Sequence, residues 1–137
     1  MVFFDTNIFL YAGSKRPDDR DKKVVASDLI LSSSFVISTQ VIQEYVSNVL
    51  TKQSLGLDES NITDFLISLE EENVISVSLD LIVSGIALRH RYQLSHWDST
   101  IVAAAIESGC STLYSEDLNN GQKFGDVTVV NPFLKAG

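Results

Sequence analysis

Four acidic residues stand far apart along the chain, each at the expected end of a strand or in the expected first turns of a helix: Asp5, Glu44, Asp98 and Asp117. Two carboxylates about 4 Å apart repel by roughly 1 kcal/mol in water and roughly 4 kcal/mol near a protein surface, so acids that converge need a cation. Carboxylate oxygens favour Mg²⁺ or Mn²⁺ over zinc. A divalent ion held by such acids lowers the pKa of a water and suits phosphodiester hydrolysis.

The elements that must position these acids follow from hydropathy. Five short apolar runs that stop at polar residues are typical of buried parallel strands: 1–4, 35–38, 74–77, 112–115 and 127–130. Between them, apolar spacings of three and four predict helices: 18–32, 40–52, 58–73, 80–93 and 97–108. In the first of these helices, Val24, Val25, Leu29 and Leu31 are expected to face the core.

The alternation of strands and helices predicts one α/β domain over residues 1–137, a three-layer α/β/α sandwich with a mostly parallel central sheet. Ligands of such sheets bind beyond the carboxyl ends of the strands. We therefore expect the four acids to lie close together at one edge of the sheet.

Each acid also has an ordinary structural explanation. Asp5 could simply end a strand, and the helix dipole favours acids such as Glu44 and Asp98 near a helix N-terminus. Asp117 could begin the turn before the sequence Asn-Asn-Gly. The shared edge is what favours a functional site over four separate explanations.

Composition narrows the possible functions. Lys and Arg number 10 against 18 Asp and Glu, so the formal net charge is −8, which argues against a general basic surface for nucleic acid. The single cysteine, Cys110, cannot form an intrachain disulfide and favours the cytoplasm. The first residues lack the basic region of a signal peptide, and no apolar run approaches the roughly 18 residues of a membrane span.

Four segments carry the acids and resemble the motifs of PIN-domain nucleases, in particular the VapC-type toxins of bacterial toxin–antitoxin pairs. They read FFDTNI from residue 3, STQVIQE from residue 38, WDSTIVAAA from residue 97 and YSED from residue 114. In order and rough spacing, the resemblance covers nearly the whole chain. It implies an α/β/α nuclease that needs Mg²⁺ or Mn²⁺ and acts on RNA.

The resemblance also implies roles for individual residues. Asp5, Glu44, Asp98 and Asp117 would be the catalytic, metal-binding acids. Thr6 and Ser115 would support these acids by hydrogen bonds, and Asn7 would help to hold the loop. A VapC-type member would be inhibited by a cognate antitoxin protein that covers or enters the acidic pocket, and it would tend to form a homodimer. Asn119 stands where some members carry a further acid, so the number of ions stays open.

Several basic and aromatic residues could contact RNA. Four basic side chains are candidates for phosphate contacts: Lys15, Arg16, Arg89 and Arg91. The alternative is a solvated helix face, which is favoured where Asp18 and Asp19 adjoin. His96 could donate a proton and Trp97 could stack on a base, although a tryptophan at a helix start more often packs with its N–H bonded.

Other functions remain as alternatives. A PIN-type nuclease could serve routine RNA processing, or the fold could be a catalytically silent binding module. A phosphotransfer protein also places an aspartate at the end of its first strand, but phosphatases of that kind want a second aspartate two residues later, where this chain has Asn7.

Overall fold

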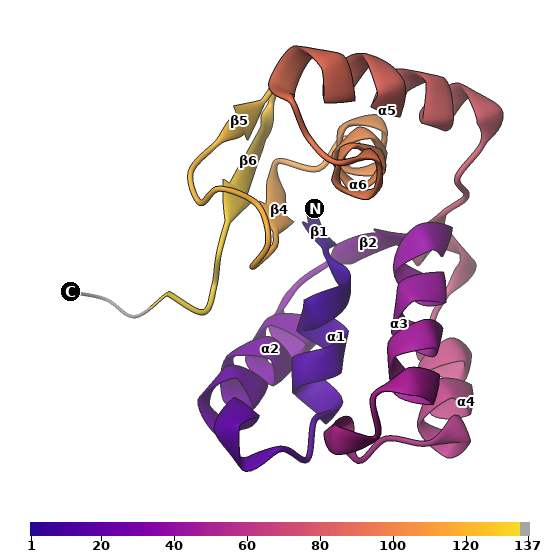
Figure 1. Ribbon diagram of the computed structural model, residues 1–137, viewed down its shortest axis with the longest axis vertical. Coiled ribbons are helices and arrows are strands. Elements are labelled where there is room, and N and C mark those ends of the chain that lie inside the picture. The colour runs from indigo at the N-terminus through magenta and orange to yellow at the C-terminus, as the bar shows by residue number, and fades with distance from the viewer. Residues whose placement is uncertain (135–137) are drawn as a thin grey trace.

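A six-stranded sheet forms the centre of the computed structural model, which describes residues 1–134 (Figure 1). Its order is β3-β2-β1-β4-β6-β5, and every neighbouring pair is parallel except β5 with β6. The strands are β1 Val2–Phe4, β2 Phe35–Ser38, β3 Val74–Ile75, β4 Thr112–Tyr114, β5 Lys123–Phe124 and β6 Val127–Val130.

Helices cover both faces of this sheet, so the predicted three-layer sandwich is confirmed. In Figure 1, α5 and α6 lie on one side of the strands and α1 to α4 lie on the other. The helices are α1 Thr6–Gly13, α2 Arg20–Ser32, α3 Thr39–Thr51, α4 Glu59–Ser68, α5 Leu79–Tyr92 and α6 His96–Glu107. Within residues 1–134, no helix combines the length and apolar character that crossing a membrane requires.

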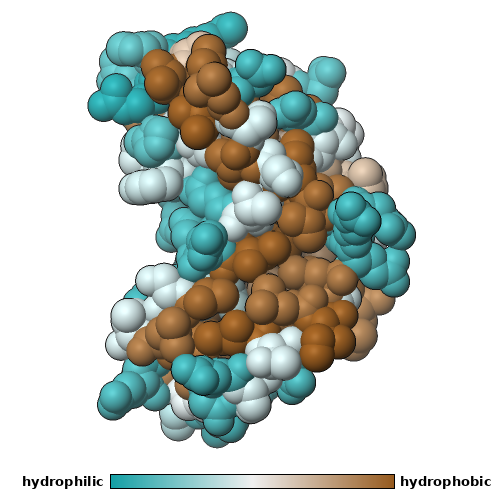
Figure 2. Space-filling view, turned by 90° about the vertical axis from the view of Figure 1, so that its right-hand side faces the viewer, coloured by the Kyte–Doolittle hydropathy of each residue, from teal (hydrophilic) through white to brown (hydrophobic). Residues whose placement is uncertain are grey.

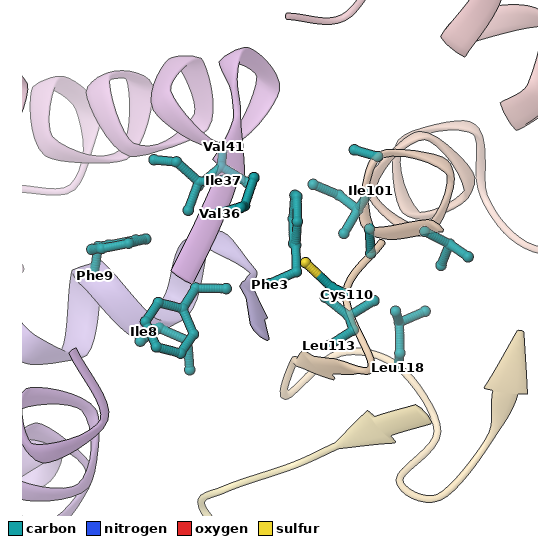
Figure 3. Close-up of a cluster of buried hydrophobic side chains, with 14 of the residues drawn as sticks. Phe3, Ile8, Phe9, Val36, Ile37, Val41, Ile101, Cys110, Leu113 and Leu118 are labelled. Atoms are coloured by element: carbon teal, nitrogen blue, oxygen red, sulfur yellow. The ribbon is translucent and has the colours of Figure 1, made fainter. Parts of the chain in front are cut away.

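The core is built around the central strand β1. Successive side chains of a strand point to opposite faces, and both Phe3 and Phe4 are fully buried, so both faces of β1 are covered. The Phe4 ring centroid lies 5.8 Å from that of Phe9 in α1. Figure 3 shows Phe3 on the opposite side, toward Ile101 of α6 and Cys110. The two hydrophobic layers fix the end of β1 and therefore the position of the residue that follows it.

The first helix, α1, was not predicted from the sequence. Ile8, Phe9 and Leu10 are consecutive and all buried, so this helix has no polar face to reveal a helical period. The side chain of Asp5 supplies its N-cap by accepting a hydrogen bond from the Thr6 N–H. The helix therefore starts directly at the strand end, without the loop that was expected there.

The predicted core face of α2 is wrong in part. Val24 is 59% exposed and Leu31 is 86% exposed, whereas Ala26 is completely buried. α2 packs against α1, and a small residue at the contact allows the two helices to approach. Hydropathy alone ranks the larger apolar side chains as the most buried, and it therefore assigns Val24 and Leu31 to the buried face of α2.

One helix boundary and one additional strand also differ from the prediction. The helix expected over 58–73 ends at Ser68, and a short 3₁₀ turn over Glu71–Asn73 precedes β3. The antiparallel strand β5 was not expected, and its turn to β6 uses Gly125 with a positive φ of 60°. A two-residue strand is too short to give a period-2 signal.

Candidate active site and metal-binding site

The structure brings the four sequence-predicted acids into one cavity of about 310 Å³. Asp5 follows β1 directly, and Asp117 follows β4 in the loop after Tyr114. Glu44 lies in α3 and Asp98 lies in the first turn of α6. Four elements that are distant in sequence therefore meet at the carboxyl end of the parallel strands, as ligand sites in such sheets do.

Asp5 is the most buried of the four acids, with 6% of its surface exposed. Its Oδ1 accepts a hydrogen bond from the Thr6 N–H at 2.7 Å, and its Oδ2 accepts one from the Ser115 hydroxyl at 2.8 Å. Burial raises the pKa of Asp5 from 3.8 to about 6, and the charges of Glu44 and Asp117 act in the same direction. The two hydrogen bonds oppose this rise and hold the carboxylate in one orientation.

Glu44 accepts hydrogen bonds at both its side chain and its backbone. The Thr6 hydroxyl donates to its Oε1 at 3.0 Å, and the Asn48 side-chain amide donates to its backbone oxygen at 2.7 Å. The helix that carries Glu44 begins at Ser38, whose hydroxyl accepts from the Val41 N–H at 3.3 Å. Thr6 therefore supports two acids at once, Asp5 through its backbone and Glu44 through its side chain.

Asp98 and Asp117 complete the cavity from the α6 side and the β4 side. The Ser95 hydroxyl caps α6 by accepting from the Asp98 N–H at 3.1 Å. The Asp117 N–H donates to the Ser115 hydroxyl at 3.2 Å, and the Asn7 side-chain amide donates to Asp117 Oδ2 at 3.4 Å. Desolvation, followed by the charge of Asp98, raises the pKa of Asp117.

The basic residues singled out from the sequence do not line this cavity. Lys15 and Arg16 lie between α1 and α2, where Arg16 pairs with Asp19 at 3.5 Å. Arg89 and Arg91 lie in the last turn of α5. Their role in RNA binding stays a prediction.

Lys52, which sequence reasoning missed, is the lysine that lines the cavity. It lowers the pKa of Asp117, in opposition to the neighbouring acids. A signal was present, because Glu44, Asn48 and Lys52 are spaced by four, with Lys52 as the C-cap residue that ends α3. Asn48 lines the cavity as well.

Trp97 does not pack as its position at the helix start suggested. It is 65% exposed and lines the acidic cavity beside Asp98. Its ring centroid lies 4.9 Å from that of His96, which is also exposed. The expectation of a buried indole at this position is therefore wrong, and the ring is free to meet a ligand.

The residues fit a hard divalent cation by their chemistry, because the donors are carboxylates supported by hydroxyl and amide groups. In residues 1–134, no three His, Cys, Asp or Glu side chains already stand close enough together to hold an ion. Unneutralised carboxylates repel, so side chains at the rim are expected to stay apart until a cation draws them in.

Comparison with known proteins gives one family and several related structures. Residues 2–123 match the sequence model of a family described as the PIN domain. No curated protein matches the sequence significantly.

The related solved structures share the fold at low sequence identity. A toxin–antitoxin complex from Klebsiella pneumoniae is 21% identical with a TM-score of 0.69, covering 97% of this chain and 98% of that chain. VapC20 of Mycobacterium tuberculosis, a Sarcin-Ricin loop cleaving toxin, is 21% identical with a TM-score of 0.66, covering 85% and 90%. VapBC2 of Rickettsia felis, bound to a promoter DNA fragment, is 22% identical with a TM-score of 0.66, covering 94% and 97%.

Proposed function

Because the chain belongs to the PIN domain family, we propose that it is an endoribonuclease that hydrolyses RNA phosphodiester bonds with Mg²⁺ or Mn²⁺. The single observation that carries the proposal is the cavity lined by Asp5, Glu44, Asp98 and Asp117 at the carboxyl end of the strands. A lone acid at a strand end is ordinary, whereas four share one cavity here. The charges of Glu44 and Asp117 help to raise the pKa of Asp5, and the charge of Asp98 helps to raise the pKa of Asp117, an arrangement that favours a cation.

The proposed chemistry divides among the cavity residues. Mg²⁺ or Mn²⁺, when bound, supplies an activated water and offsets the charge that develops on the phosphate. The four carboxylates hold the cation, and Thr6, Asn7 and Ser115 keep three of them in place by donating hydrogen bonds. Lys52 at the cavity wall attracts the phosphate of the substrate.

The proposal includes a role as the toxin of a toxin–antitoxin pair, in the cytoplasm, with a cognate antitoxin protein as partner. Its support is the likeness to a toxin–antitoxin complex and to VapBC2. A homodimer is also proposed. Leu79, Val83 and Ile86 of α5 are exposed by 76%, 58% and 45%. Figure 2 views the side of the molecule that carries α3, α4 and the N-terminal end of α5, and hydrophobic side chains gather there.

The nuclease proposal is tested by cleavage of a total RNA pool with Mn²⁺, comparing the unchanged protein with Asp98→Asn. We expect cleavage by the unchanged protein, loss of cleavage in excess EDTA, and at least a hundredfold slower cleavage by Asp98→Asn, comparable to the loss of about 3 kcal/mol when one group that stabilises transition-state charge is removed. Asp126→Asn is the matched control, because Asp126 is exposed and outside the cavity. Full activity of Asp98→Asn, or activity in EDTA, would contradict the proposal.

Expression in cells separates a toxin from an RNA-processing enzyme. A toxin is expected to arrest growth when it is produced alone, and Asp98→Asn is expected not to do so. Normal growth, together with cleavage of defined RNA precursors by the purified protein, would favour RNA processing. Tight binding of a partner protein, without RNA cleavage at any Mg²⁺ or Mn²⁺ concentration, would favour a silent binding module.

A further inference from the structure

Glu116 lies between two residues of the candidate site, Ser115 and Asp117, but its side chain takes no part in the cavity. The Tyr11 hydroxyl donates to Glu116 Oε1 at 2.6 Å, and the Lys22 ammonium donates to Glu116 Oε2 at 2.6 Å. Lys22 also donates to the Tyr11 hydroxyl at 3.2 Å. We refer to these three side chains, Tyr11, Lys22 and Glu116, as the Glu116 clamp.

The Glu116 clamp joins parts of the chain that are distant in sequence. Tyr11 is in α1 and Lys22 is in α2, whereas Glu116 is in the loop after β4. Among residues 1–134, the other ion pair, between Arg16 and Asp19, is local and spans three residues. The clamp is therefore the ion pair that ties the loop of Asp117 to the helices below the sheet.

The clamp is partly shielded from water, which strengthens it relative to an exposed pair. The side chain of Glu116 is 24% exposed and that of Lys22 is 37% exposed. The Lys22 ammonium also lies 4.7 Å from the centroid of the Tyr11 ring, a cation–π distance. Both carboxylate oxygens of Glu116 already have short hydrogen bonds, so Glu116 is occupied and is not a fifth candidate ligand of the cation.

Asp117 itself is held weakly. Within the part of the chain that the structure describes, its carboxylate accepts one side-chain hydrogen bond, from Asn7, and that contact is long at 3.4 Å and exposed. Its orientation must therefore come from the backbone of residues 115–117. That backbone is fixed on one side by Ser115, which donates to Asp5 at 2.8 Å and accepts from the Asp117 N–H at 3.2 Å. On the other side it is fixed by the Glu116 clamp.

We propose that Glu116 is a positioning residue whose clamp by Tyr11 and Lys22 holds the carboxylate of Asp117 toward the cavity of Asp5, Glu44 and Asp98. This inference rests on the proposed function, because it assigns Glu116 a task in the same site. Glu116 acts only through Asp117 and touches neither the cation nor the RNA. Loss of the clamp lets the loop rotate, so that the cation keeps three of its four carboxylates.

The test is the affinity for Mn²⁺, measured without RNA by calorimetry on the full chain. Glu116→Gln and Lys22→Met are expected to weaken Mn²⁺ binding about tenfold, the usual effect of removing a group that orients a metal ligand. In cleavage assays, the same variants are expected to need about tenfold more Mn²⁺ for half-maximal rate, and saturating Mn²⁺ is expected to restore most of the rate. Lys22→Arg keeps the ion pair and is expected to rescue both properties.

Lys123→Met is the matched control, because Lys123 is an exposed lysine of β5 outside the cavity and the clamp. A merely structural role would lower the melting temperature and leave the Mn²⁺ affinity of the folded variant unchanged, which would overturn the proposal. Unchanged Mn²⁺ dependence in both Glu116→Gln and Lys22→Met would overturn it as well.

A failure of the proposed function can be told apart from a failure of the clamp. Hydrogen exchange of the Asp117 amide, which donates to Ser115, needs neither cation nor RNA. Faster exchange in Glu116→Gln than in the unchanged protein is expected if the clamp orders the loop. If the unchanged protein neither binds Mn²⁺ nor cuts RNA, the proposed function fails, and equal exchange rates would reject the clamp independently.

Discussion

The ionised form of Asp5 is unfavourable as long as no cation is present, because its carboxylate is buried and shares a cavity with other carboxylates. The pKa of Asp5 is 3.8 when exposed and about 6 in the folded protein. Below pH 3.8 Asp5 is protonated in both the folded and the unfolded state and does not lower the free energy of unfolding. Above pH 6 it is ionised in both states, and the full destabilisation of the folded state is present. A rise of this size corresponds to roughly 3 kcal/mol. The stability of the metal-free protein from this group therefore falls as the pH rises from 4 to 6.

We expect Asp5→Asn to make the metal-free protein more stable at pH 7, by up to roughly 3 kcal/mol, while abolishing cleavage. Asparagine can still accept from the Thr6 N–H, and its amide can donate to the Ser115 hydroxyl. Urea unfolding in EDTA at pH 7 and at pH 4 measures the effect, which should nearly vanish at the lower pH. Asp126→Asn, an exposed change, should alter neither value, and a destabilised Asp5→Asn at pH 7 would contradict the argument.

Lys52 is the second residue whose environment makes a direct prediction. It is the cation at the wall of an acidic cavity, so it can meet a substrate phosphate that the acids would otherwise repel. In the Asp5→Asn background, where cleavage is absent, Lys52→Gln is expected to weaken single-stranded RNA binding and to reduce the salt slope by about one. Fluorescence anisotropy at several salt concentrations measures both. Lys123→Gln should leave the slope unchanged, and an equal effect of the two variants would remove Lys52 from the site.

At the scale of elements, helix N-termini carry much of the site. Ser38 caps α3, which presents Glu44, and Ser95 caps α6, which presents Asp98. Asp5 itself caps α1. The same hydrogen bonds that start three helices therefore also set where three of the acids stand.

Ser95→Ala is expected to destabilise the protein by about 1 kcal/mol, because the Asp98 N–H loses its partner and the first turn of α6 frays. The fraying moves Asp98, so Mn²⁺ should bind more weakly as well. Ser95→Thr keeps the hydroxyl and should restore both stability and binding. Denaturant unfolding measures the free energy of unfolding, and calorimetry measures the Mn²⁺ affinity. A loss of stability without any change in Mn²⁺ affinity would show that the cap does not position Asp98.

Sequence patterns predicted some elements well and others poorly, for physical reasons. The strand ending at Ser38 and the helix of Glu44 were predictable because a buried strand and an amphipathic helix have different periods. α1 was not, because it is buried on several sides and has no period. In α2, packing against α1 favours Ala26 over the larger Val24, a choice that depends on the neighbouring helix rather than on hydropathy.

At the scale of the whole molecule, the sheet order decides which acids could be predicted to meet. Parallel strands β1 and β4 are neighbours, so residues following their ends must lie close, and Asp5 and Asp117 share a cavity for that reason. The Glu116 clamp was not predictable in the same way. It depends on how α1 and α2 pack beside the loop after β4, which no local sequence pattern records.

The chain has a formal net charge of −8, and a bound divalent cation would make this charge less negative. Binding to the folded state alone stabilises it by about 2.7 kcal/mol at a ligand concentration of one hundred times Kd. For a domain of this size, that corresponds to a rise in melting temperature of roughly 10 °C. We expect such a rise with Mn²⁺ in the unchanged protein and a much smaller one in Asp98→Asn, measured by calorimetry. An equal rise in both would indicate non-specific screening of the acidic surface.

Trp97 allows the cation to be located without any measurement of cleavage. It is the one tryptophan in the chain, and it lines both the cavity of the four acids and the adjoining pocket beside Gln40, so its fluorescence reports on this part of the molecule. Paramagnetic Mn²⁺ bound there should quench the emission in a saturable way, EDTA should reverse the quenching, and diamagnetic Mg²⁺ should compete without quenching. Asp98→Asn should need a far higher Mn²⁺ concentration, whereas Asp126→Asn should match the unchanged protein. Quenching that rises linearly with Mn²⁺ and ignores Mg²⁺ would mean that the ion meets Trp97 only by collision, and the acidic cavity would then lose its proposed role.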